Sequence, residues 1–227
     1  MADTLIPFTQ KHLDTAVALF RESYRKEREH SPLLPTRALD DPTWLRDALA
    51  ACLDNALWNS DPGVAVMRDA RLAAYMVTGA QFPWKGQRVA LVPEYGHSAI
   101  TEDKETLYQR MYMHLAQIWV DAHTHLHIIG HLAHDDILRE TLYQLGFGAI
   151  LAEQLRDLSP IDAPTDIAIV QEPDIHKLAD LELEHNRYYP KAPVFLTKDT
   201  DRSAMLADLD EQAQAGDAFF TYYTLNG

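Results

Sequence analysis

Titratable and aromatic side chains cluster just after an apolar segment that ends at Val92. Glu94, Tyr95 and His97 follow it directly. A carboxylate or an imidazole with a pKa near the working pH can accept a proton from an amine. Polar residues at the end of a strand are also typical of solvated turns. The pattern therefore supports two hypotheses: Glu94 or His97 as a base with Tyr95 facing the substrate, or a polar cap on a sheet edge.

A second group of candidates consists of the histidines between positions 123 and 134. His125 and His127 alternate along a predicted strand, so both face one side, which is a two-ligand arrangement for a metal. Zinc needs three or four ligands, and the other histidines, His131 and His134, lie beyond a glycine. The pattern therefore favours solvated histidines at a sheet edge, and no metal site is predicted. His134 with Asp135 is the more promising polar pair.

Composition is that of a globular protein and argues against several classes of partner. The formal net charge of −14 disfavours nucleic acid, because a phosphate backbone is bound mainly by Lys and Arg. It also disfavours an anionic membrane surface, and it is compatible with a cationic substrate such as an amine. Cys52 is the single cysteine, so no internal disulfide or cysteine-based zinc site is expected. With no membrane-spanning apolar run and no signal peptide, we expect a cytoplasmic protein.

Periodicity predicts the elements that would position these side chains. A strand at Thr4–Phe8 precedes a helix that starts near Gln10, whose polar face includes Glu27. A second helix starts at Pro42, with Asp41 as its N-cap. Three strands are then expected, at Val64–Arg68, Leu72–Thr78 and Val89–Val92. A long helix is expected at about Glu102–Ala122.

A strand followed by a capped helix is the clearest unit in the sequence. The strand is expected at His125–Leu132 and the helix at Ile137–Leu145. Asp135 can accept hydrogen bonds from the first helical turn, and Gly146 stands where a left-handed C-cap is required. A closing strand is expected at Ala149–Arg156.

A short polar segment that contains prolines divides the chain. We interpret residues 159–165 as a linker between a first domain, residues 1–158, and residues 166–227. The order strand, helix, helix, strand then restarts, with strands at Asp166–Val170 and Ala218–Leu225. We therefore expect an internal repeat whose second copy is present as its N-terminal half. The exposed edge of its last strand predicts pairing with another sheet or a homodimer.

The complete order of elements, with Leu145-Gly146-Phe147 closing the last helix of the first domain, resembles the GNAT acyltransferase superfamily. The resemblance implies an α/β (α+β) fold with a mixed, mostly antiparallel central sheet flanked by helices. It also implies acetyl-CoA as cofactor, held between the fourth and fifth strands. It covers residues 4–158 completely and residues 166–227 as a first half, as in a tandem-GNAT protein.

The resemblance also implies roles for individual residues. Glu94 or His97 would be the base, and Tyr143 lies nearest to the position of the acid that protonates the departing thiolate. Tyr188 and Tyr189 would form an aromatic wall on the acceptor side, or else pack at a helix end. The cofactor-binding set would be Leu91, Val92, Pro93, His131 and His134.

Two departures from the family pattern predict a degenerate first domain. Family members carry glycines before the long helix, whose backbone N–H groups bind the pyrophosphate. The corresponding segment has Gly96 alone, and Glu102 and Asp103 would repel phosphate. Leu142 occupies the position of the acid tyrosine, and Tyr143 lies about 100° further round the helix. These departures argue against acetyl-CoA turnover by this domain.

Two functions are favoured by these observations, and a His-based metalloprotein is a distant third. The first is an acyltransferase that moves an acetyl group from acetyl-CoA to a small amine, with the competent site expected in the second copy. The second is a non-catalytic GNAT-like module for binding or dimerisation. A gap between the strands Val89–Val92 and His127–Leu132 would favour the first function, and strands hydrogen-bonded throughout would favour the second.

Overall fold

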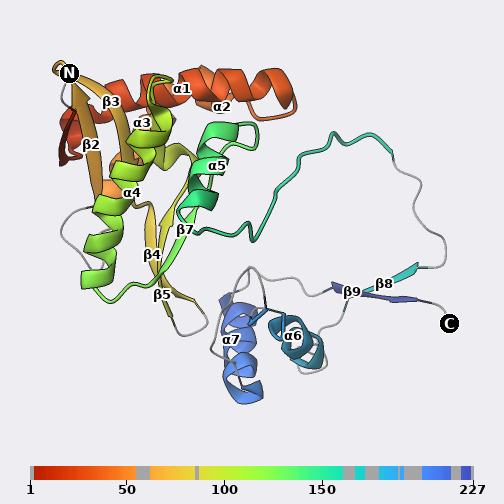
Figure 1. Ribbon diagram of the computed structural model, residues 1–227. Coiled ribbons are helices and arrows are strands. Elements are labelled where there is room, and N and C mark those ends of the chain that lie inside the picture. Colours follow the sequence, from red (N-terminus) through yellow and green to blue (C-terminus); the bar gives the residue numbers. More distant parts are fainter. Residues whose placement is uncertain are drawn as a thin grey trace. The chain divides into compact units, whose positions relative to one another are not determined.

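The computed structural model describes residues 3–54, 62–84, 87–160, 167–171, 179–188, 190–191, 201–215 and 221–225. These residues belong to two compact units, Met1–Gly148 and Ala149–Gly227 (Figure 1). The elements of the first unit are β1 (Thr4–Pro7), the 3-10 turn η1 (Gln10–His12), α1 (Leu13–His30), α2 (Arg37–Asp40), α3 (Pro42–Asp54), β2 (Gly63–Arg68), β3 (Arg71–Val77), β4 (Ala80–Trp84), β5 (Gln87–Val92), the 3-10 turn η2 (Glu94–Gly96), β6 (His97–Ala99), α4 (Lys104–Asp121), β7 (Leu126–Ile129) and α5 (Asp136–Gln144).

Strands β2 and β3 form the centre of a four-stranded antiparallel sheet with the order β1-β2-β3-β6. Asp69 and Ala70 have φ angles of 53° and 61°, which are positive as a two-residue hairpin turn requires. Side chains alternate along β2, because Ala65 packs with α1 and α3 whereas Val64 and Val66 pack with α4. Helices α1 and α3 therefore cover one face of this sheet, and α4 and α5 lie on the other (Figure 1).

A three-stranded sheet, with the order β4-β5-β7, completes the first unit. Strands β4 and β5 are antiparallel, whereas β5 and β7 are parallel. The sequence predicted β5 and β7 but neither β4 nor β6. Pro83 lies within β4, where it is tolerated because β4 is an edge strand, and β6 is too short to show a period.

Local end signals of the helices are confirmed. Oδ1 of Asp41 accepts a hydrogen bond from N–H of Trp44 at 3.0 Å, at the start of α3. Oδ1 of Asp135 accepts one from N–H of Leu138 at 3.2 Å, at the start of α5. Gly146 has a φ of +92°, as expected for a left-handed residue after α5.

The predicted closing strand at Ala149–Arg156 is wrong. This segment is neither strand nor helix, and all its side chains are exposed. Ile150 and Leu151 are adjacent and Leu155 follows four residues later, so the apolar residues do not alternate and no single face could bury them.

The second unit repeats the order of elements that opens the first. It contains β8 (Ile167–Gln171), α6 (Ala179–Asn186), α7 (Arg202–Ala215) and β9 (Thr221–Leu225). β8 and β9 pair antiparallel, as β1 and β2 do, so β9 has a partner within its own unit. The two helices pack through Ala179, Met205 and Leu209.

The predicted domain boundary stays a prediction. The chain divides into the two compact units between Gly148 and Ala149, ahead of the predicted linker, and residues 149–160 contain no helix or strand. Most of the predicted linker lies outside the described residues. So do the first residue of the predicted strand Asp166–Val170 and the first three residues of the predicted strand Ala218–Leu225.

Candidate functional site

The two sheets of the first unit part at Gly130. Strands β5 and β7 are paired up to Val92 and Ile129, and N–H of Gly130 donates to O of Val92 at 2.8 Å. A Cβ atom at position 130 would lie 3.3 Å from N of Glu94, so the close approach favours glycine. After β5 the chain turns through η2 and enters the other sheet as the edge strand β6. The strands Val89–Val92 and β7 are therefore hydrogen-bonded along their whole overlap, which is the arrangement expected for the non-catalytic module, and the two segments part only beyond Gly130.

A pocket of about 450 Å³ lies beyond this point. Its walls come from α1, from the connection between β6 and α4, and from the segment between β7 and α5. The volume falls within the range of small-molecule sites, about 300–1,000 Å³. Its charged lining residues are four carboxylates and two ammonium groups, from Glu22, Glu27, Glu102, Asp135, Lys26 and Lys104. The lining of this acidic pocket therefore favours a cation over an anion.

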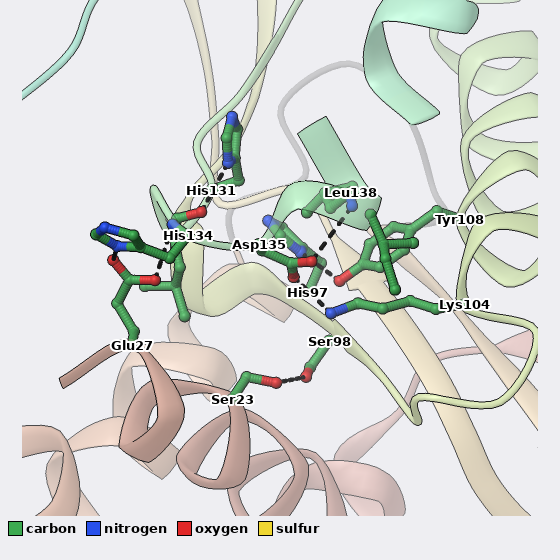
Figure 2. Close-up of polar contacts among 12 residues, drawn as sticks. Ser23, Glu27, His97, Ser98, Lys104, Tyr108, His131, His134, Asp135 and Leu138 are labelled. Atoms are coloured by element: carbon green, nitrogen blue, oxygen red, sulfur yellow. Dashed lines mark hydrogen bonds and ion pairs between the residues drawn. The ribbon is translucent and has the colours of Figure 1, made fainter. Parts of the chain in front are cut away.

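The most enclosed carboxylate of the acidic pocket is that of Glu27, which is 5% exposed. Its Oε1 accepts a hydrogen bond from Nδ1 of His134 at 2.7 Å, and its Oε2 accepts one from the backbone N–H of His134 at 3.0 Å (Figure 2). The imidazole of His134 also stacks on that of His30, with 4.8 Å between ring centroids. A carboxylate–imidazole pair thus joins α1 to the segment that follows β7.

The prediction that Glu27 faces water is wrong. Glu27 follows Phe20 and Tyr24 at helical spacing, on the buried stripe of α1. That spacing is the signal that could have identified it, because a carboxylate on an apolar stripe needs a partner when it is buried.

Lys104 makes a second polar link at the acidic pocket. Its Nζ lies 2.5 Å from Oδ2 of Asp135, and the two side chains are only 13% and 15% exposed (Figure 2). Asp135 therefore pairs with Lys104 through one oxygen and caps α5 through the other. Lys104, which the sequence reasoning missed, is the first residue of α4, where helix N–H groups and the helix dipole favour an anion.

His97, one of the two predicted bases, is 4% exposed. Its Nε2 lies 2.7 Å from O of Gly130, and its Nδ1 lies 2.9 Å from the hydroxyl of Tyr108. Because a carbonyl only accepts, Nε2 carries the proton and Nδ1 accepts from Tyr108. Burial lowers the pKa of His97 to about 4. The ring is therefore neutral with both nitrogens engaged, and it links β6 to the end of β7.

Glu94 and Tyr95 both lie in η2 but face different surroundings. Glu94 is exposed and lines a cavity of about 10 Å³ that shares Asp135 with the acidic pocket. Tyr95 is half-buried and packs on the core beneath α1 and α3. Burial raises the pKa of Tyr95. Glu94 therefore lies at the margin of the acidic pocket, whereas Tyr95 is not part of its lining.

The predicted cofactor-binding residues lie in several environments. The backbone carbonyls of Leu91, Val92 and Pro93 each accept one hydrogen bond at 2.8 Å. The donors are N–H of Gly79 to Leu91, N–H of Gly130 to Val92 and N–H of Gly96 to Pro93. Nδ1 of His131 lies 2.9 Å from O of Leu132, and His131 does not line the acidic pocket. His134 is the member of the predicted set that does.

The three tyrosines named from the sequence are not part of the acidic pocket. Tyr143 lies on α5, is 46% exposed and lines neither cavity. Tyr188 follows α6 in the second unit and is 61% exposed, with Nζ of Lys191 4.7 Å from its ring centroid. Tyr189 lies outside the described residues.

Neither a metal site nor a membrane span is found in the described part of the chain. No three His, Cys, Asp or Glu side chains there are arranged to hold a metal ion. None of the described helices is both long enough and apolar enough to cross a bilayer.

Comparisons with known proteins identify the fold. No family model and no curated protein matches the sequence. A GCN5-related N-acetyltransferase from Ralstonia eutropha JMP134 has a similar structure, with a TM-score of 0.50 and 8% sequence identity over 70% of this chain and 100% of that chain. At this identity the likeness shows the fold alone, a mixed α/β architecture of the GNAT kind with antiparallel sheets flanked by helices. The predicted fold class is therefore confirmed, and the tandem arrangement stays a prediction.

Two other solved structures have lower TM-scores. A ribosomal-protein-alanine N-acetyltransferase from Brucella melitensis biovar Abortus 2308 has a TM-score of 0.48 and 10% identity, over 70% of this chain and 100% of that chain. A predicted acetyltransferase from Clostridium acetobutylicum, solved with acetyl-CoA, has a TM-score of 0.48 and 11% identity, over 69% of this chain and 97% of that chain.

Proposed function

We propose that this protein transfers an acetyl group from acetyl-CoA to a small amine, using the acidic pocket of its first unit. The observation that carries this proposal is the position of the pocket, which opens where the edge strand β6 and the end of β7 part beyond Gly130. In the superfamily that the sequence resembles, the cofactor lies between the corresponding strands. Carboxylates outnumber ammonium groups in the lining, which suits a substrate that carries a positive charge.

Two lysines at the opening suit the phosphates of acetyl-CoA, whereas the single glycine, Glu102 and Asp103 depart from the family pattern. Lys104 supplies a cation at the first turn of α4, where the family uses backbone N–H groups to bind the pyrophosphate. Lys26, whose side chain is 61% exposed, is the second ammonium group of the lining. Of these departures, the exposed carboxylate of Glu102 lines the acidic pocket itself. Bound acetyl-CoA would supply an acetyl thioester as acyl donor: acylation of the neutral amine would break the C–S bond, and the second proton lost by the nitrogen would leave on the CoA thiol.

The chain's own contribution is to bind the amine as a cation, take its proton and shield the reacting atoms from water. Glu94, one of the two bases that the sequence suggested, lies exposed at the margin of the acidic pocket, and its role as base stays a prediction. A competent site in the second copy also stays a prediction, because residues 172–178 and 192–200 lie outside the described part of the chain.

A non-catalytic binding module is the second candidate, and a specific observation favours it. The contact of His97 with Gly130 and the ion pair of Lys104 with Asp135 both join the two sides of the opening. An enzyme would have to bind the cofactor beside the His97–Gly130 contact. Lys104 would also have to release Asp135 and bind a phosphate instead.

Two measurements on the full chain separate these candidates. Calorimetric titration reports acetyl-CoA binding, and release of the CoA thiol in the presence of a panel of small primary amines reports transfer. The enzyme is expected to bind acetyl-CoA and to release thiol only when an amine is added. Amine binding without any heat from millimolar acetyl-CoA would support the module and contradict the enzyme.

A further inference from the structure

Within the proposed function, on which this inference rests, we infer that His134 is the proton acceptor of the acidic pocket and that Glu27 positions it. The two residues lie far apart in the sequence and meet at the pocket wall, through both oxygens of one carboxylate. The sequence suggested His134 for a different role, next to the cofactor, and did not suggest Glu27 at all.

The hydrogen bonds of the pair determine which nitrogen of His134 can act. Oε1 of Glu27 accepts, so the proton of the neutral imidazole stays on Nδ1 at 2.7 Å from that oxygen. The lone pair of the ring then lies on Nε2. The second bond, from the backbone N–H of His134 to Oε2 of Glu27, fixes the carboxylate and so prevents the ring from drifting.

Nε2 of His134 is open to a substrate. Among the described residues it has no hydrogen-bond partner, and the side chain is 46% exposed on the wall of the acidic pocket. Stacking on His30, with rings 16° from parallel, holds the imidazole plane (Figure 2 shows the ring of His134 beside Glu27). His97 is the opposite case, because both of its nitrogens are engaged and it is buried.

The step assigned to His134 balances simply. An amine enters as its ammonium ion, and one N–H bond breaks as the proton moves to Nε2 of His134. The electron pair left on the amine nitrogen is then free to form the bond to the acetyl carbon. The imidazolium, next to the carboxylate of Glu27, later gives its proton to water through the exposed side of the ring. Per turnover, one proton passes from the substrate to the solvent.

A purely structural role is the alternative, since the pair also ties the segment after β7 to α1. The two roles differ in what restores activity. Free imidazole can replace a missing proton acceptor in a cavity of matching size, but it is not attached to the backbone and so cannot restore the link between two segments.

The test compares His134→Ala with His114→Ala, because His114 is an exposed histidine of α4 that does not line the acidic pocket. His134→Ala is expected to lower kcat/KM for the amine by about 100-fold or more, with acetyl-CoA affinity unchanged and with partial recovery in added imidazole. His114→Ala is expected to stay within about twofold of the wild type. If His134→Ala melts below the assay temperature, His134→Gln is used in its place, because glutamine can still donate a hydrogen bond to Glu27. The rescue by added imidazole is then not measured.

Glu27→Gln tests the positioning residue. The amide of glutamine can donate to Nδ1, which moves the ring proton to Nε2 and leaves Nε2 without a lone pair to accept a proton. The acidic limb of the pH profile of kcat/KM is expected to change. The value of kcat is expected to fall by about tenfold or more, with acetyl-CoA binding kept.

The outcomes separate this inference from the proposed function. A wild-type protein that releases no thiol with any amine contradicts both. A wild-type protein that is active, with full activity kept in His134→Ala or lost only in Glu94→Gln, overturns the inference and leaves the proposed function in place. A loss in His134→Ala that imidazole does not restore, accompanied by a lower melting temperature, assigns the pair a structural role and also overturns it.

Discussion

Nε2 of His97 donates a hydrogen bond to O of Gly130 at 2.7 Å, and this bond joins the edge of one sheet to the end of a strand in the other. The hydroxyl of Tyr108 on α4 occupies the remaining nitrogen. The ring of His97 therefore links the two sheets at the point beyond which the acidic pocket opens.

Unfolding as a function of pH should reveal this buried histidine. Burial lowers the pKa of His97 from 6.5 to about 4, so the folded state binds this proton less readily than the unfolded state does. The contribution is fully present above pH 6.5 and is lost as the pH falls towards 4. The free energy of unfolding of the wild type should therefore fall by about 3 kcal/mol more between pH 7 and pH 4 than that of His97→Gln, in urea titrations. Equal slopes for the two proteins would contradict the assignment.

Removing the charge of Asp135 should strengthen acetyl-CoA binding. Asp135→Asn keeps an oxygen for the cap on Leu138 but releases the ammonium group of Lys104 for a phosphate. The dissociation constant is expected to fall by about 3- to 10-fold, and Lys104→Gln to raise it by a similar factor, in calorimetric titrations at low salt. Glu140→Gln is the matched control, because it removes an exposed carboxylate from the same helix outside the acidic pocket. Affinity that responds equally to Asp135→Asn and Glu140→Gln would show a general charge effect only.

The thiol of Cys52 should not react with thiol reagents in the folded protein. It is 2% exposed, and burial raises the pKa of its thiol to about 11, so almost no thiolate is present at pH 8. A disulfide reagent should therefore label no thiol in native buffer and one thiol per chain in denaturant. Rapid labelling in native buffer would contradict the burial of Cys52, and it would also add a background to the thiol-release assay.

Local signals in the sequence were sufficient for most of the fold. The helix α1 carries a regular apolar stripe, and Asp41 and Asp135 are caps that act within a single helical turn. The hairpin of β2 and β3 likewise depends on two turn residues. Strands β4 and β6 escaped prediction because each is specified by the neighbour with which it pairs rather than by its own pattern.

The candidate site was harder to predict, because tertiary packing assembles it. Glu27 and His134 are separated by 107 positions, and Lys104 and Asp135 by 31. The sequence identified His134 and Asp135, since both lie at a turn where a strand gives way to a helix. It missed Glu27, since the polar residues around it on α1 suggested a solvated face. His97 was singled out by residue type, and only its buried surroundings show that both nitrogens are occupied.

Gly96 should be needed for the turn that separates the two sheets. A Cβ atom there would lie 2.8 Å from Cδ of Pro93 and 2.9 Å from O of Val77, so Gly96→Ala must displace η2. A loss of about 1–3 kcal/mol in the free energy of unfolding is expected, together with weaker acetyl-CoA binding, because η2 leads directly into His97. Gly146→Ala is the control: a Cβ atom there meets nothing within 4 Å, and its positive φ of +92° adds only backbone strain of about 1 kcal/mol. Urea unfolding and calorimetry should show that both variants lose stability but that only Gly96→Ala loses affinity. If both variants keep full affinity, η2 does not control the opening of the acidic pocket.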